Sequence, residues 1–100
     1  MTQIQIQNAN SAVQETVHHL LSEAIIREQQ ILQAALDKTS KRLQYFEQLQ
    51  GQTSEQFFAL YQQGNAGDSD TAIDWAGEYQ ILIALKNKLS SLKDIVLARS

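Results

Sequence analysis

The stretch that decides the fold of this chain runs from Leu32 to Phe46 and reads LQAALDKTSKRLQYF. Its apolar residues recur in alternating steps of four and three, at positions 32, 36, 43 and 46, with Thr39 in register. A helix whose apolar side repeats every seven residues packs lengthwise against another helix. This stretch therefore predicts one member of a coiled-coil-like helix pair.

A second stretch with the same repeat begins at Trp75 and reads WAGEYQILIALKNKLSSLKDIV. Its apolar stripe consists of Trp75, Leu82, Leu85, Leu89, Leu92 and Val96. We expect Ile73, Ile81 and Ile95 to broaden this stripe. Two such helices in one short chain predict an antiparallel hairpin.

The segment between the two stripes predicts a turn that contains a short helix. Gly51 is a typical helix stop, because glycine adopts the left-handed conformation that ends many helices. Thr53 with Gln56 three residues later is a candidate capping box, and Asp70 is a candidate N-cap for the last helix. We expect an all-α fold: a long antiparallel helical hairpin with a short helix at the turn. Residues 11–98 form a single helical domain, with helices at about 11–49, 54–63 and 70–98.

The first helix is expected to be longer than its partner. At 1.5 Å per residue it is about 58 Å long, against about 43 Å for the last helix. The apolar residues at its free end then have no partner within the chain; they are Val13, Val17, Leu20 and Leu21. We therefore expect a dimer or another protein to bury them. A kink near Arg27–Gln30 that folds the first segment back is the alternative.

Residues 1–10 are polar, and Ile4 and Ile6 alternate with glutamines. This segment is expected to be disordered or to form a short strand. A strand of this kind, with Gln3, Gln5 and Gln7 aligned, would also suit a ribbon-type DNA-binding regulator.

Composition excludes several classes of protein. The 100 residues contain no cysteine and no proline, and the formal net charge is -3. No apolar run approaches the roughly 20 residues that span a bilayer, and residues 1–6 lack the features of a signal peptide. Lysine and arginine form no basic stripe, so nucleic acid is not an expected partner. We expect a cytoplasmic protein without a membrane partner.

Residues with catalytic or metal-binding potential are few. His18 and His19 are adjacent, so on a helix they point in different directions and cannot easily share a metal. Helix capping explains Asp68, Asp70 and Asp74 better than calcium binding does. No phosphate loop, nucleophile arrangement or cofactor motif is present. We therefore expect no enzyme activity, no cofactor and no metal.

The residues around the turn have a further pattern. It consists of Phe46-Glu47, Thr53 to Phe58, Gly64, Gly67-Asp68, Asp70 and Trp75-Ala76-Gly77-Glu78. This pattern resembles a family of small helical proteins of cyanobacteria and archaea that are regarded as antitoxin-like partners of TumE-type toxins. The sequence departs from them at Ala66, where a larger apolar residue is usual.

The resemblance implies a protein–protein interaction module that binds and neutralises a small toxin. The partner surfaces would be the overhanging first helix and the turn region, in particular Asp70, Asp74, Trp75 and Glu78. Core packing is the more common role for a residue such as Trp75, and it is the first expectation here. A self-assembling structural or adaptor protein is the rival interpretation.

Overall fold

The computed structural model describes residues 10–99, with side chains described for residues 11–95. It contains the helices α2 (Asn10–Gln50), α3 (Ser54–Gln62) and α4 (Asp70–Arg99), and no strand among these residues. The predicted all-helical fold is confirmed. The expectation of a disordered segment or a strand before Asn10 lies outside the described residues.

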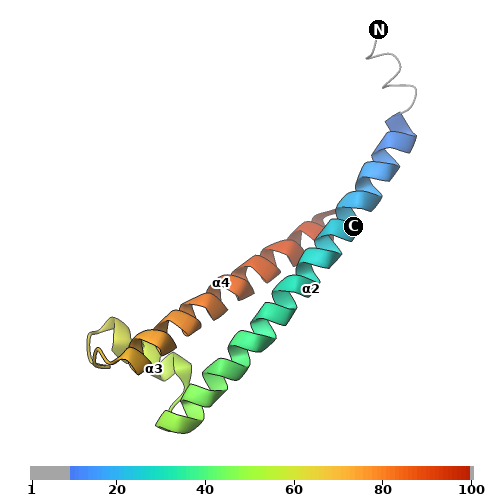
Figure 1. Cartoon of the computed structure of the whole chain (residues 1–100). Coiled ribbons are helices and arrows are strands. Elements are labelled where there is room, and N and C mark those ends of the chain that lie inside the picture. The colour runs from blue at the N-terminus through green and yellow to red at the C-terminus, as the bar shows by residue number, and fades with distance from the viewer. Residues whose placement is uncertain (1–9, 100) are drawn as a thin grey trace.

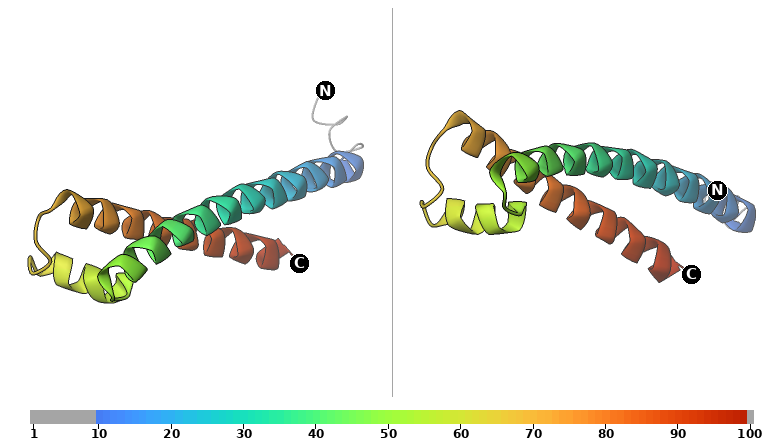
Figure 2. Two further views of the ribbon diagram at one scale, coloured as in Figure 1. Left: turned by 60° about the horizontal axis from the view of Figure 1, so that its bottom comes forward. Right: turned by 90° about the horizontal axis from the view of Figure 1, so that it is seen from below.

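The three helices form an elongated molecule in which α4 runs back along α2 and α3 lies at one end (Figure 1). The principal extents are 66 × 22 × 22 Å and the radius of gyration is 21.1 Å, against about 13 Å for a compact domain of this length. α2 continues without a break through Arg27–Gln30 and curves only gently (Figure 2). The alternative of a kink in this region is therefore wrong.

The contact between α2 and α4 follows the heptad positions of both stretches. Leu32, Thr39 and Leu43 on α2, and Trp75, Leu82 and Leu89 on α4, are all at most 8% exposed. We call this contact the seam. The expected broadening of the α4 stripe is wrong, because its three isoleucines lie beside the seam and are half exposed: Ile73 50%, Ile81 49% and Ile95 46%.

Local hydrogen bonds define the end of the hairpin where α2 stops and α4 starts, which we call the turn end. Gly51 has φ +68°, and its N–H donates to the Glu47 carbonyl at 2.8 Å, which ends α2. Thr53 and Gln56 form the predicted capping box at α3. The N-cap of α4 is Ser69 rather than Asp70, since the Ser69 hydroxyl accepts from the Ala72 N–H at 3.1 Å. Asp70 instead lies in the first turn.

Aromatic rings form the core of the turn end. Trp75, only 1% exposed, stacks against Phe57 at 3.9 Å between ring centroids and against Phe46 at 5.8 Å. Its Nε1–H donates to the Ser54 hydroxyl at 2.8 Å, and the Ser54 backbone N–H donates to a Glu47 carboxylate oxygen at 2.8 Å. These contacts join all three helices, so the turn end has a fixed shape.

Candidate partner-binding surfaces

The free end of α2 has no partner helix. Phe46 stacks on Trp75, and Arg42 bonds to Glu78. If this pairing of positions continues along both helices, the end of α4 lies opposite residue 22 of α2. We call residues 11–21 the overhang. Its four apolar residues, the first set of predicted contact residues, are all exposed: Val13 49%, Val17 48%, Leu20 58% and Leu21 44%.

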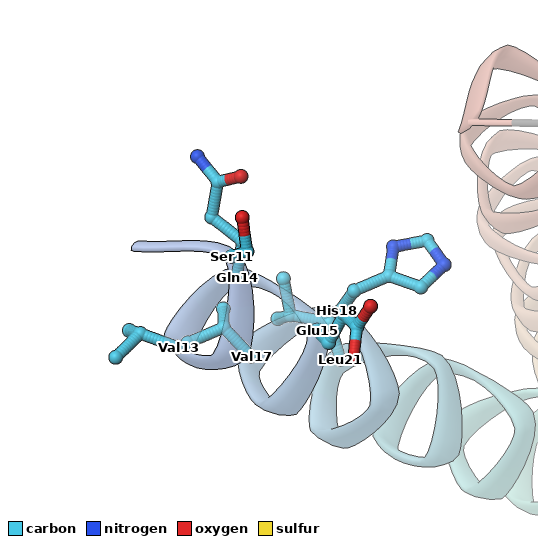
Figure 3. Close-up of a pocket in the computed structure, with 7 residues that line it drawn as sticks. All are labelled: Ser11, Val13, Gln14, Glu15, Val17, His18 and Leu21. Atoms are coloured by element: carbon cyan, nitrogen blue, oxygen red, sulfur yellow. The ribbon is translucent and has the colours of Figure 1, made fainter. Parts of the chain in front are cut away.

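The apolar residues of the overhang do not continue the seam. The seam positions on α2 follow one another in steps of three and four residues. Continuing these steps from Ile25 toward the N-terminus gives four polar residues: Ser22, His18, Glu15 and Ser11. In Figure 3 the Val13 side chain and the His18 ring point to different sides of α2. A longer α4 would therefore not cover Val13, and the apolar residues of the overhang belong to another contact.

The surface around the overhang is open rather than enclosed. The hollow drawn in Figure 3 is lined by residues of α2 alone. A cavity that holds a small molecule needs walls from several directions, which one helix cannot supply. The shape and the apolar residues therefore suit a protein helix better than a small ligand.

The second set of predicted contact residues lies at the turn end. Asp70 and Asp74 are exposed in the first turns of α4. Glu78 is partly buried, with 17% of its side chain exposed, and bonds to the Arg42 guanidinium at 2.7 Å. Trp75 is buried in the core, so its contribution to any contact surface here is indirect.

A groove joins Asp74 and Glu78 to an exposed aromatic ring. It has a volume of about 470 Å³ and is lined by Arg42, Tyr45, Phe46, Asp74 and Glu78. The Tyr45 ring is 64% exposed and meets the Phe46 ring edge-on at 5.9 Å. Tyrosine is a common anchor of protein interfaces. Tyr45 and Arg42 did not stand out in the sequence, because Tyr45 lies outside the heptad positions and Arg42 meets Glu78 only in the folded chain.

Charge is segregated along the hairpin. Residues 43–85 contain six acidic residues and no lysine, arginine or histidine. The acidic residues are Glu47, Glu55, Asp68, Asp70, Asp74 and Glu78. All eight lysines and arginines of the chain lie outside this segment, although Arg42 at its edge bonds to Glu78. The segment forms the turn end and the adjoining parts of α2 and α4. In the sequence this segregation is visible as the absence of any basic residue between Arg42 and Lys86.

The two sets of predicted contact residues lie at opposite ends of the molecule, as Figure 1 shows for the start of α2 and the turn end. They therefore form two surfaces and not one site. Among the described residues, no group of three or more metal-ligating side chains comes together. No helix in the described part of the chain is long and apolar enough to cross a membrane.

Comparison with known proteins adds no family to these observations. No family model matches the chain, and neither a curated protein nor a solved structure is significantly similar to it.

Proposed function

We propose that this protein is a protein–protein interaction module. One observation carries the proposal: more large apolar side chains are exposed than buried. Thirteen in the described residues are between 41% and 64% exposed, whereas six are at most 8% exposed. Full burial of a large apolar side chain is worth about 1.5–3 kcal/mol relative to water. In a single hairpin these exposed side chains remain in water. Association with another chain would bury them and gain this free energy.

The turn end supports a more specific form of this proposal. The partner bound there is a protein with a basic surface, because residues 43–85 carry six carboxylates and Arg42 neutralises one of them, Glu78, which leaves a net negative charge that favours association with positive charge. Tyr45 supplies the apolar anchor, and the exposed Asp74 lines the same groove, with Asp70 exposed about one turn earlier on α4. The residues that resemble the antitoxin-like family lie at this same end.

We therefore propose that the protein acts as an antitoxin-like component that binds and neutralises a small basic toxin in the cytoplasm. This role needs no cofactor, no metal and no catalytic residue of the chain. The ribbon-type DNA-binding alternative depends on residues 1–9, which lie outside the described residues.

The experiment that tests this role is capture of the partner by the tagged protein from its native cells, followed by binding measurements with the purified proteins. We expect one small basic protein at a ratio near one to one. Its affinity should fall at least tenfold with Tyr45→Ala and with Asp74→Lys, and fall with rising salt concentration. Gln44→Ala, at the exposed residue beside Tyr45, is the control and should bind like the wild type.

The outcome of these measurements decides the proposal. Equal binding by the Tyr45→Ala, Asp74→Lys and Gln44→Ala variants would show that the partner does not use the turn end. Capture of nothing but copies of the same chain would favour the self-assembling adaptor and contradict the antitoxin-like role.

A further inference from the structure

The exposed apolar residues of α2 form a stripe that extends well beyond the overhang. It follows steps of three and four residues through Val17, Leu20, Ala24, Ile31 and Ala34, with the charged Arg27 in register between Ala24 and Ile31. All six are exposed; Leu20 is 58% exposed and Ile31 57%. At 1.5 Å per residue the stripe is about 26 Å long. This is a second heptad pattern on one helix, distinct from the seam. We call it the outer stripe.

The outer stripe faces away from α4. At 3.6 residues per turn, its mean direction lies about 140° around α2 from that of the seam residues Ile25, Gln29 and Leu32. A helix can therefore pack on the outer stripe without disturbing the hairpin. The stripe also lies away from the turn end, so its occupant need not compete with a partner bound at Tyr45.

We infer that a second copy of this chain occupies the outer stripe, with the two α2 helices antiparallel. Placing the twofold axis between Ile25 and Ile26 sets Leu20 opposite Ile31 of the second copy. The same register sets Val17 opposite Ala34 and Ala24 opposite Arg27. Each layer then pairs two branched side chains or one large with one small side chain, which fills the space between helices.

Charge complementarity selects this arrangement. Arg27 lies opposite Ala24 of the second copy, where Glu23 and Glu28 are its neighbours. The two Arg27 side chains are then offset by three residues along the axis instead of facing each other, and four carboxylates surround them. A parallel pair in register would instead place Arg27 against Arg27 and bring Glu23 near Glu28 of the other chain. Shifting the antiparallel pair by one heptad would set Arg27 opposite Val17, where Gln14, Thr16 and Leu21 offer no carboxylate. Like charges facing each other are unfavourable in helix pairs.

The hairpin prepares α2 for this contact. An isolated helix must first be nucleated, which is costly, but α2 is already held along the seam from Ile25 to Phe46. The resulting dimer has two overhangs, each lying beside the middle of the other α2. Its two turn ends point in opposite directions and stay open. This inference does not depend on the partner proposed for the turn end.

Sedimentation of the full chain tests the dimer. We expect the mass to rise with concentration from the 11.3 kDa of one chain to twice that value. Leu20→Lys and Ile31→Lys should each raise the dimer dissociation constant at least tenfold. Ile81→Lys alters a residue of similar exposure on α4 and should leave it unchanged. A mass that stays at one chain into the high micromolar range would overturn the inference, as would equal effects of all three variants.

Disulfide cross-linking tests the direction, since the chain contains no cysteine. Mixing Leu20→Cys with Ile31→Cys protein under mild oxidation should give a linked dimer of the two variants. Rapid linking of Leu20→Cys protein to itself would indicate a parallel pair and contradict the register. Circular dichroism shows whether each variant stays helical. Asp74→Lys, which alters the turn end, should leave both the mass and the cross-links unchanged, so the two proposals fail or succeed separately.

Discussion

The indole N–H of Trp75 donates a hydrogen bond of 2.8 Å to the hydroxyl of Ser54, 21 residues earlier in the chain. Both residues are buried, at 1% and 3% exposure. The Ser54 backbone N–H in turn donates to Glu47, so one short chain of bonds connects α4, α3 and α2. The turn end, and with it the position of Tyr45 and Asp74, depends on this connection.

Replacing Trp75 with phenylalanine should lower the free energy of unfolding. The ring can still stack on Phe57, but the buried Ser54 hydroxyl loses its donor, which costs about 1–3 kcal/mol. Urea unfolding monitored by circular dichroism measures the change. The double variant Trp75→Phe with Ser54→Ala should recover part of the loss, because no buried hydroxyl then lacks a partner. Additive losses from the two substitutions would show that the hydrogen bond contributes nothing.

Shortening Leu43 to alanine should destabilise the hairpin by about 2–5 kcal/mol. Leu43 is 3% exposed in the seam, so its removal leaves a cavity between α2 and α4. Ile81→Ala is the matched control: this residue is 49% exposed, and the loss should be at most about 0.5 kcal/mol. Thermal unfolding of both variants, at a concentration where the chain is monomeric, checks the difference. Equal losses would mean that the seam is not where the structure places it.

Replacing Glu78 with leucine should leave stability unchanged or raise it by about 1 kcal/mol. Glu78 occupies a heptad position between Trp75 and Leu82, and its partner Arg42 remains 59% exposed, so no buried charge is left behind. Because the Arg42 side of this pair lies in solvent, we expect the pair to contribute only about 0–1 kcal/mol. Chemical unfolding measures the effect. A loss of more than 2 kcal/mol would show that the Arg42–Glu78 pair holds the hairpin together.

Substituting alanine for Gly51 should destabilise the turn end by about 1–2 kcal/mol, because φ is +68° there and an L-residue in this conformation is strained. The added methyl group meets no atom within 4 Å, so the loss comes from the backbone alone. Gly77→Ala is the control. Gly77 also has open space around its Cβ position but lies inside α4, where alanine is favoured. Its variant should be at least as stable as the wild type by thermal unfolding.

Much of the fold follows from spacing in the sequence. The heptad steps in 32–46 and 75–92 predicted the residues that are buried in the seam, and Thr53 with Gln56 predicted the cap of α3. The three isoleucines beside the α4 stripe were misplaced because a seam between two helices is narrow, and apolar character alone does not show which side of a helix is covered.

Other features of the molecule depend on contacts between distant residues. Ser54 reads as an ordinary residue near a helix start, and only the fold brings it to Trp75. Ser69 and Asp70 are both good helix caps, and the sequence does not decide between them. The acidic turn end does not show in the net charge of the chain, because only the hairpin places the middle of the chain at one end of the molecule (Figure 1).

Hydrogen exchange of the full chain, measured by mass spectrometry at low and at high protein concentration, tests most directly whether the exposed surface of α2 is a contact for another chain. A backbone amide exchanges when the helix around it opens locally. If a second chain binds only the closed helix, exchange becomes slower as the concentration of that chain rises. The account predicts that exchange over residues 11–24 slows markedly as the concentration rises, while exchange in the seam around Leu43 is already slow at the low concentration. Equally fast exchange of residues 11–24 at both concentrations would mean that no other chain covers this segment, and would contradict the account.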